Sequence, residues 1–344
     1  MSTNQNTDPD KPFEYIFETY YDTNAEKGRN NVEDQIWDGE LAIVPWLDRR
    51  GLEPQDVHEE HVKEYFHELK DTYSPNTQWE YARKIRFIYD KFLSRGIVGF
   101  EANPFEIVLE DHDILDPVYN KEAKIHPKKA IRECLDEMHP VVFAMSMTML
   151  KTTRRIGGTC NLDMCDLHLD HPAADWDVVR ELRDKPDHLY YSPVPEAGEE
   201  FRGELRRDSA KSETKTVIPI DDELKDTLIW YLSMRRSSEN SGPLFTQFTT
   251  TNEGVRMTRD VYGNQVRTIA KELGYWYEPY DPDNIRPHYW RHWTTSSMKD
   301  QVNNSIVDYF RGDSGDTSDG YNHYTEEKAK AWLNHIPKIY PHYE

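Results

Sequence analysis

A short basic motif near residue 290 carries groups that can handle a phosphate. The segment Arg-Pro-His-Tyr-Trp-Arg-His, residues 286–292, places His288 three residues before Arg291. An arginine offers bidentate, charge-assisted hydrogen bonds to phosphate oxygens, and a histidine can transfer protons near neutral pH. The tyrosine-rich segment Tyr-Asn-His-Tyr follows at 321–324, and a tyrosine hydroxyl can act as a covalent nucleophile. The two motifs together suggest phosphoryl transfer through a tyrosine.

Two further segments upstream supply the other groups that such a reaction needs. Covalent cleavage of a phosphodiester requires cations at the non-bridging oxygens, an acid for the leaving oxygen and in-line geometry. The segment Thr-Thr-Arg-Arg-Ile-Gly-Gly at 152–158 offers two arginines. The segment Ala-Lys-Ser-Glu-Thr-Lys-Thr-Val-Ile-Pro at 210–219 offers Lys211, eight residues before Pro219, and a second lysine, Lys215.

The net charge of the chain does not indicate a nucleic-acid partner. Among 344 residues there are 63 acids and 42 lysines plus arginines, which gives a formal net charge of −21 and a pI of about 5.1. A DNA-binding domain is normally basic. Two interpretations stay open: an acidic enzyme without a nucleic-acid partner, or a halophilic protein. In concentrated salt the short Debye length weakens repulsion from phosphates.

Targeting signals and cysteine patterns are both absent from the sequence. There is no run of eighteen apolar residues, and the polar start of the chain does not resemble a secretory signal. The three cysteines, Cys134, Cys160 and Cys165, form neither a metal-ligand pattern nor an even disulfide framework. We therefore expect a cytoplasmic protein without a membrane span.

The length and the changes in composition predict two folded domains. We expect a flexible N-terminal tail over residues 1–30 and an all-α domain over 31–110. A linker rich in Asp and Pro is expected over 111–125, and a larger second domain over 126–344. The larger domain would carry the four phosphate-handling segments.

Local patterns predict a mainly α protein with a small β-sheet, the α+β class. Thr77 with Glu80 is a capping-box pair, which predicts the start of a helix. Residues 189–191 and 216–220 are typical of strands. Asp221 precedes an amphipathic pattern and is expected to begin a helix.

The four segments resemble, in order, the motifs of the tyrosine recombinases, the phage-integrase and Xer-type family. Thr-x-x-Arg-Ile-Gly-x-x-x-x-Leu-x-x-x-Asp-Leu, which contains Arg155, is similar to the first arginine box. The segment of Lys211 resembles the β-hairpin lysine segment, and residues 288–292 resemble the second box. Arg-Gly-Asp at 311–313 and the segment beginning at Tyr321 resemble the final Leu-Gly-His and tyrosine motifs.

This resemblance covers residues 126–340, and the all-α domain is similar to the family's SAM-like core-binding domain. The form Arg-Arg-Ile-Gly-Gly-Thr and the acidity look most like haloarchaeal members. The implied architecture is a C-shaped clamp around double-stranded DNA that carries a specific recombination site. The implied assembly is a homotetramer on DNA and a monomer in free solution.

The resemblance also implies a role for each residue of the site. Arg155 and Arg291 would hold the scissile phosphate, and Lys211 would protonate the leaving 5′ oxygen. His288 would assist proton transfer, and Tyr321 would attack to give a 3′-phosphotyrosine. The reaction would need no metal, no ATP and no cofactor. Candidate contacts to other phosphates are Lys84, Arg86, Arg206 and Arg207.

Some positions depart from the family pattern. Asp313 stands where the family usually has His or Trp, and Gly158 stands where it often has an acid. Tyr324 is an alternative nucleophile to Tyr321, and Lys215 is an alternative to Lys211.

The C-terminal segment and the function each leave alternatives open. A short apolar helix near the C-terminus could pack at home or dock on a neighbouring protomer; its apolar residues are Ala329, Trp332, Leu333 and Ile336. Besides a recombinase, the chain could be a catalytically silent DNA-binding relative or a type IB-like topoisomerase. A metal-dependent nuclease is disfavoured because the sequence contains no cluster of carboxylates.

Overall fold

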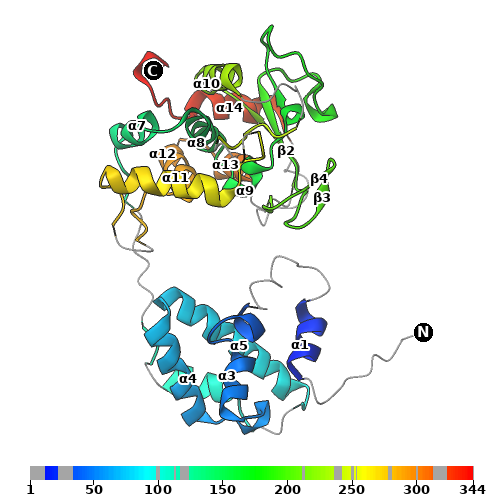
Figure 1. Ribbon diagram of the computed structural model, residues 1–344, viewed down its shortest axis with the longest axis vertical. Helices are drawn as coiled ribbons and strands as arrows, with labels where there is room; N and C mark the ends of the chain where they lie inside the picture. Colours follow the sequence, from blue (N-terminus) through cyan, green and yellow to red (C-terminus); the bar gives the residue numbers. More distant parts are fainter. Residues whose placement is uncertain are drawn as a thin grey trace, which may run out of the picture. The chain divides into compact units, whose positions relative to one another are not determined.

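The computed structural model describes residues 12–21, 34–97, 101–111, 114–116, 124–210, 214–235, 242–248, 252, 254–277, 281–299, 301–312 and 324–343. Contacts divide the chain into two compact units, Met1–Asn120 and Lys121–Glu344, which Figure 1 draws in blue-to-cyan and in green-to-red. The division falls within the linker expected over 111–125. None of the helices in the described ranges is both long and apolar enough to cross a bilayer.

The first unit is built from helices around an aromatic core. Its elements are α1 (Pro12–Tyr21), η1 (Asp34–Asp38), α3 (Ile43–Arg50), η2 (Pro54–Asp56), α4 (Glu59–Thr72), α5 (Pro75–Ser94) and α6 (Pro104–Asp111). Trp46, Tyr65 and Phe105 are fully buried, and the ring of Tyr65 meets the other two edge-on. Such edge-to-face pairs add to the stabilisation from apolar burial.

Helix α1 corrects the expected N-terminal tail. Residues 12–21 are helical, and Phe13 packs edge-on against Phe92 with ring centroids 5.0 Å apart. Ile16 and Phe17 are buried in the same core. The expectation of a flexible tail is therefore wrong for these ten residues, because their apolar side chains lie on the core-facing side of a helix.

Helix α5 begins three residues earlier than the capping-box pattern predicts, which would make Thr77 the N-cap. Its N-cap is Ser74 and its first residue is Pro75, so Thr77 lies inside the first turn. Proline is favoured at this position because its missing N–H has no partner to lose there. The Oγ atoms of Ser74 and Thr77 lie 3.1 Å apart, which joins the two hydroxyls instead of a capping box.

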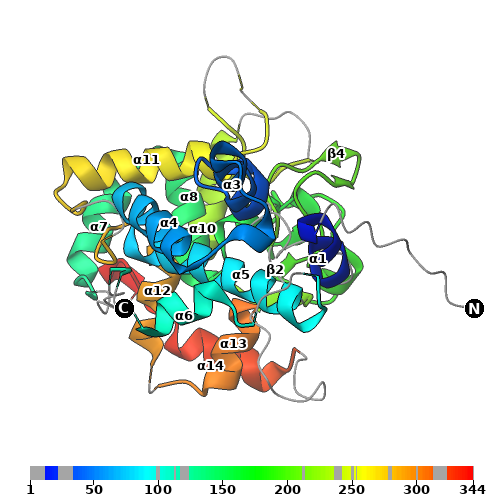
Figure 2. The same ribbon diagram turned by 90° about the horizontal axis from the view of Figure 1, so that it is seen from below.

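The second unit is organised around one buried helix. Its helices are α7 (Lys128–Asp136), α8 (Pro140–Thr152), α9 (Ile156–Cys160), α10 (Asp222–Met234), α11 (Arg259–Glu272), α12 (Pro287–Met298), α13 (Asn304–Arg311) and α14 (Glu326–His335). Helix α8 contacts α7, α9, α10, α11 and α12, and Figures 1 and 2 both show it inside this group. It is mostly apolar and buried on nearly every side, as is typical of a central core helix.

A three-stranded antiparallel sheet, in the order β1-β2-β5, lies beside the helices. Its strands are β1 (Leu167–His168), β2 (His188–Tyr191) and β5 (Thr216–Pro219), which confirms the two strands predicted from the sequence. Tyr191 pairs with Thr216, and Tyr190 pairs with Val217. Because side chains alternate along a strand, these two pairs face opposite sides of the sheet. A separate hairpin pairs β3 (Glu200–Phe201) with β4 (Glu204–Leu205).

The C-terminal segment packs on its own unit. Trp332 of α14 is fully buried, and α14 contacts α13 and β5. Beyond α14, the Nζ atom of buried Lys151 binds the carbonyl of Pro337 at 2.7 Å and a carboxylate oxygen of Asp221 at 2.7 Å. The carboxylate of Glu223 accepts hydrogen bonds from the backbone N–H groups that follow, at 339 and 340. Of the two expected arrangements, the structure has the one in which the C-terminal helix packs on its own unit.

Candidate active site

The first arginine box lies at the exit of the central helix. Helix α8 ends at Thr152, and Thr153 adopts the left-handed conformation with φ 53°. The chain thereby turns, and Arg155 becomes the extended N-cap residue of the short helix α9. Arg155 is half-buried, whereas Arg154 is almost fully buried at 2% exposure. Of the two arginines in the box, Arg155 is thus the one that reaches solvent.

Helix α12 carries the second box. Its N-cap is Arg286, and Pro287 occupies the first helical position. His288 and Arg291 are three residues apart and therefore share a face of the helix. The Nη1 atom of Arg291 donates hydrogen bonds to the carbonyls of Thr153, at 2.9 Å, and Arg311, at 2.8 Å. Arg291 thus joins the first box to the end of α13.

A set of arginines surrounds His288. Burial and nearby positive charges lower the pKa of His288 to about 4. In falling order of effect, the charges are those of Arg291, Arg286, Arg155 and Arg311. The side chain also reaches solvent, so the arginines as well as burial keep the imidazole neutral at pH 7. The structure therefore brings together three predicted site residues, Arg155, His288 and Arg291.

A basic groove of about 780 Å³ begins at this cluster and follows α11. Ile156 and His288 line the groove next to the cluster. Along α11 it is lined by Arg259, Gly263, Arg267 and Lys271. The last four are spaced by four residues and so lie on one helical face. Trp276 lies beneath the cations of Arg267 and Lys271, at 5.4 and 5.8 Å from its ring centroid. Arg286 and one acid, Asp260, also line the groove, so positive charge predominates there although the chain has a net charge of −21.

The segment that leads to Lys211 lies against the first box. A Cβ atom on Gly157 would overlap the carbonyl oxygen of Ser209, so the absence of a side chain allows this approach. Ala210 is buried, and its carbonyl lies 3.6 Å from where a Cβ of Gly158 would be. Lys211 itself lies outside the described residues, but its neighbour is beside the box that carries Arg155.

The alternative lysine faces a different surface. Lys215 immediately precedes β5, and its Nζ atom lies 3.4 Å from a carboxylate oxygen of Glu181. By strand alternation it points away from the face that carries Thr216 and Tyr191. Lys215 is therefore paired with Glu181 on the other face of the sheet.

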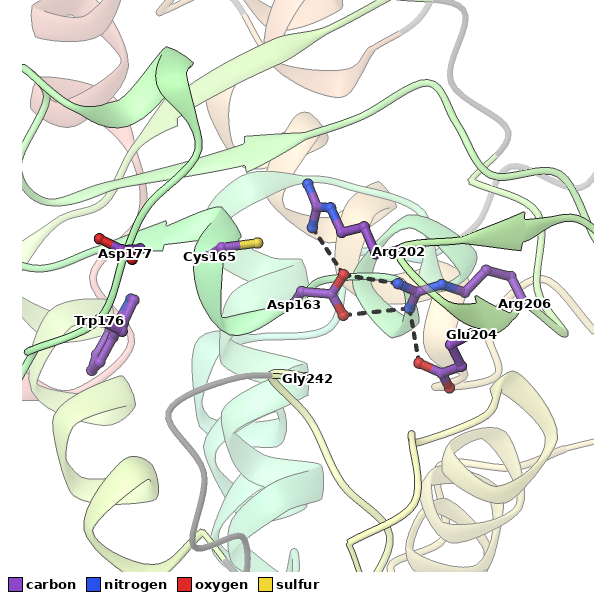
Figure 3. Close-up of a pocket in the computed structure, with 8 residues that line it drawn as sticks. All are labelled: Asp163, Cys165, Trp176, Asp177, Arg202, Glu204, Arg206 and Gly242. Carbon is purple, nitrogen blue, oxygen red and sulfur yellow. Dashed lines mark hydrogen bonds and ion pairs between the residues drawn. The ribbon is translucent and has the colours of Figure 1, made fainter.

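An ion-pair network fixes the β3–β4 hairpin to the chain that follows α9, as Figure 3 shows. Arg206 is 1% exposed and donates to Asp163 at 2.8 Å. Arg202 donates to both oxygens of Asp166, at 2.8 and 2.9 Å. The prediction of Arg206 as a phosphate contact is therefore wrong, because its guanidinium is buried against a carboxylate.

The same network contains a grouping of possible metal ligands, Asp163, Cys165 and Asp166, whose ligand atoms lie within 4.8 Å of one another. Both carboxylates are already paired with arginine. Although burial opposes it, the charge of Arg256 and the hydrogen bond of Arg206 lower the pKa of Asp163. The grouping is an ion-pair network that supports the hairpin before Lys211, and it lines a separate cavity of about 510 Å³.

Tyr324, the alternative nucleophile, is held by the sheet. Its hydroxyl lies 2.9 Å from the Nε2 atom of His188, and the side chain packs against the small cluster of Leu182, Tyr190 and Val217. Burial, followed by the charge of Glu326, raises the pKa of Tyr324 to about 12. Its hydroxyl is thus engaged on the sheet face opposite Tyr191. Tyr321 and Asp313 lie outside the described residues.

The structure also adds residues to which the sequence patterns gave no role. Arg286 and Arg311 bring two more positive charges to His288. Both stand within quoted motifs, but neither occupies a position to which the resemblance assigns a function. Their contribution depends on how α12 and α13 converge, which no local pattern encodes. Trp293 of α12 is buried and donates to the carbonyl of His126 at 2.8 Å.

No protein-family model matches the sequence, and no curated protein matches it. The structure, however, is similar to solved DNA complexes. A Tn1549 transposon integrase in complex with transposon right end DNA has 17% identity and a TM-score of 0.62, over 95% of this chain and 98% of that chain. A lambda integrase dimer bound to a COC′ core site has 12% identity and a TM-score of 0.58, over 90% and 95%.

A lambda integrase tetramer bound to a Holliday junction is also similar, with 12% identity and a TM-score of 0.59, over 90% of this chain and 77% of that chain. These likenesses extend over both units. The helical first unit and the mainly helical second unit with its small sheet therefore agree with one known architecture: the chain has the tyrosine recombinase fold.

Proposed function

We propose that this protein is a site-specific DNA recombinase, or integrase, that cuts and rejoins strands through a 3′-phosphotyrosine. One observation carries the proposal: the basic groove along α11 reaches His288, whose imidazole is also under the influence of the charges of Arg155 and Arg291. A phosphodiester chain lying in this groove would place one phosphate among the arginines. The similarity in fold to integrases solved with DNA supports the same assignment.

In the proposed reaction the hydroxyl oxygen of Tyr321 attacks the scissile phosphorus and the bond to the 5′ oxygen breaks. Arg155 and Arg291 neutralise the charge that develops on the non-bridging oxygens. Lys211 gives a proton to the leaving 5′ oxygen, and neutral His288 assists transfer of the tyrosine proton. The phosphodiester energy is kept in the phosphotyrosine bond, so a 5′ hydroxyl can reverse the step without ATP.

The proposed partner is double-stranded DNA with a specific recombination site. The first unit would act as the core-binding domain, with Lys84 and Arg86 of α5 as phosphate contacts, and Arg207 is a third candidate. We propose a monomer in free solution and a homotetramer on DNA. The lambda integrase complexes, a dimer on a core site and a tetramer on a Holliday junction, support this assembly.

The covalent intermediate provides the test. Labelled duplexes covering the DNA on both sides of the gene, each nicked so that cleavage is trapped, are incubated with the full chain. A protein–DNA adduct that survives a denaturing gel is expected. Tyr321→Phe should abolish the adduct, and Tyr324→Phe should keep it. If both variants keep the adduct, the proposed nucleophile is wrong.

A catalytically silent DNA-binding relative is the second candidate. Asp313 motivates it, because an ionised aspartate in place of a hydrogen-bond donor would repel a phosphate. Protection of one duplex in footprinting, with no adduct on any nicked substrate, would favour this alternative. Relaxation of any supercoiled plasmid would instead favour a type IB-like topoisomerase.

A further inference from the structure

Arg154, next to Arg155, is buried at the junction of several segments. Its guanidinium carbon lies 4.7 Å from the ring centroid of Tyr191 in β2. Its Nη1 atom donates to the Oγ1 atom of Thr216 in β5, at 3.3 Å. The side chain is only 2% exposed. Arg154 therefore points into the unit, toward the strand that follows the Lys211 segment.

The same guanidinium meets the end of α13. Its Nη1 atom lies 3.5 Å from the carbonyl oxygen of Phe310. Gly312, the left-handed residue that ends α13 with φ 67°, lies so close that a Cβ atom there would overlap the guanidinium. The last carbonyls of a helix have no partner within the helix, and cations are favoured at this end. Arg154 is therefore a cap on the C-terminus of α13.

Arg291 also caps this end of α13, at the carbonyl of the next residue, Arg311. It joins the carbonyl of Arg311 to the carbonyl of Thr153. Hydrogen bonds from two arginines, Arg154 and Arg291, thus connect residues 153–154 to residues 310–312. The chain that leaves Gly312 carries Asp313 and, nine residues after Gly312, Tyr321. The starting point of that chain is consequently fixed relative to Arg155.

We propose that Arg154 is a positioning residue for strand cleavage. It fixes the positions of three parts relative to one another: the first box, strand β5 of the lysine segment and the start of the tyrosine segment. This inference rests on the proposed function. A methionine would fill a similar volume without the cost of taking a guanidinium out of water. The buried guanidinium of Arg154 instead contacts β2, β5 and the end of α13.

The test separates positioning from stability. The variants are Arg154→Met, Arg154→Lys and Gly312→Ala, and the control is Leu228→Ala, a buried residue of α10 outside the site. DNA affinity, the adduct rate at saturating DNA and the melting temperature are measured for each. Lysine keeps a cation and one donor, so it should restore part of the rate.

The expected signature is a change in rate without a change in affinity. Arg154→Met should lower the adduct rate about 100-fold, as expected for a small misplacement of reacting groups, with an affinity within about 3-fold of wild type. Arg154→Lys should lie within about 10-fold of wild type. Leu228→Ala should lose stability but keep its rate per folded molecule.

Gly312→Ala disturbs the same contact, because its new methyl group would overlap the guanidinium of Arg154. This variant provides the test if Arg154→Met does not fold. It should slow the reaction with little change in affinity. A wild-type rate in Gly312→Ala, or a rate loss in Arg154→Met no larger than that of Leu228→Ala, would overturn the inference. Failure of the wild-type protein to form any adduct would overturn the proposed function instead.

Discussion

The Nη1 atom of Arg291 donates a 2.9 Å hydrogen bond to the main-chain carbonyl of Thr153, two residues before Arg155. One guanidinium of the second box is therefore oriented by the backbone of the first. The plane of a guanidinium is rigid, so fixing one nitrogen restricts the directions in which the others can donate. The two arginines proposed to hold the phosphate are placed relative to each other before any substrate binds.

Replacing Arg291 by lysine tests this orientation. A single ammonium cannot reproduce a planar fork that reaches two carbonyls and a phosphate. We expect Arg291→Lys to lower the rate of adduct formation by about 100- to 1,000-fold, as for loss of one preorganised donor. Arg183→Lys, at an exposed arginine, is the matched control and should keep the wild-type rate. Equal rates in the two variants would contradict the assigned role.

Local patterns in the sequence predicted the parts of the fold that depend on neighbours in the chain. Strands β2 and β5 and the start of α10 at Asp221 were predicted because alternation and capping are local signals. The resemblance assigned Arg155, His288 and Arg291 to one site, and in the structure the charges of both arginines act on His288.

Long-range contacts account for what the sequence did not predict. Arg206 is buried by Asp163, forty-three residues away, and no local signal distinguishes it from the exposed Arg207 beside it. Helix α1 is ordered because its aromatic face meets α5, more than sixty residues later. The cap that Arg154 makes on α13 joins residues 156 positions apart.

Two adjacent glycines of α9 should respond differently to the same substitution. A Cβ at Gly157 would collide with the carbonyl of Ser209, whereas a Cβ at Gly158 would make ordinary contacts at 3.6 Å. We expect Gly157→Ala to lose about 1–3 kcal/mol of unfolding free energy from overpacking. It should also slow cleavage, because Lys211 follows that segment. Gly158→Ala should be within about 0.5 kcal/mol of wild type. Denaturant unfolding would contradict this account if Gly158→Ala were the more damaging.

The charge of Arg286 should be visible in the titration of His288. Positive neighbours disfavour the imidazolium, so removing one of them must raise the pKa. Arg286→Gln is expected to move the pKa of His288 upward from about 4 toward its ordinary value of 6.5. NMR titration of the imidazole signals, assigned with His288→Gln, measures the shift.

The consequence for activity has a defined sign. In the wild type the imidazole is neutral from about pH 5 upward, so the cleavage rate should not vary with this group between pH 6 and 8. In Arg286→Gln a fraction becomes protonated as the pH falls toward 6, and the rate should depend on pH there. Arg183→Gln removes an exposed arginine and should leave the titration unchanged. An unchanged pKa in Arg286→Gln would show that its charge does not act on the imidazole.

Lys151 should be more important for stability than any surface ion pair. Its ammonium is 2% exposed and binds Asp221 and Glu223, which are also buried. Lys151→Met would leave these carboxylates with less compensating charge, which typically costs about 3–5 kcal/mol. Lys225→Met, which removes a partly exposed pair with Asp187, should cost less than about 1 kcal/mol. Similar midpoints of urea unfolding for the two variants would refute the difference.

Tyr324 should matter for packing and not for chemistry. Its hydroxyl bonds to His188, so Tyr324→Phe removes one hydrogen bond and should cost about 1 kcal/mol of unfolding free energy. The adduct rate should stay within about 3-fold of wild type, since the side chain still packs against the cluster that contains Tyr190 and Val217. His188→Phe removes the other partner of this hydrogen bond, and its adduct rate should likewise stay within about 3-fold of wild type. Loss of the adduct in Tyr324→Phe, with retention in Tyr321→Phe, would transfer the nucleophilic role to Tyr324. The tyrosine segment would then have to leave the His188 contact before it could reach the arginines.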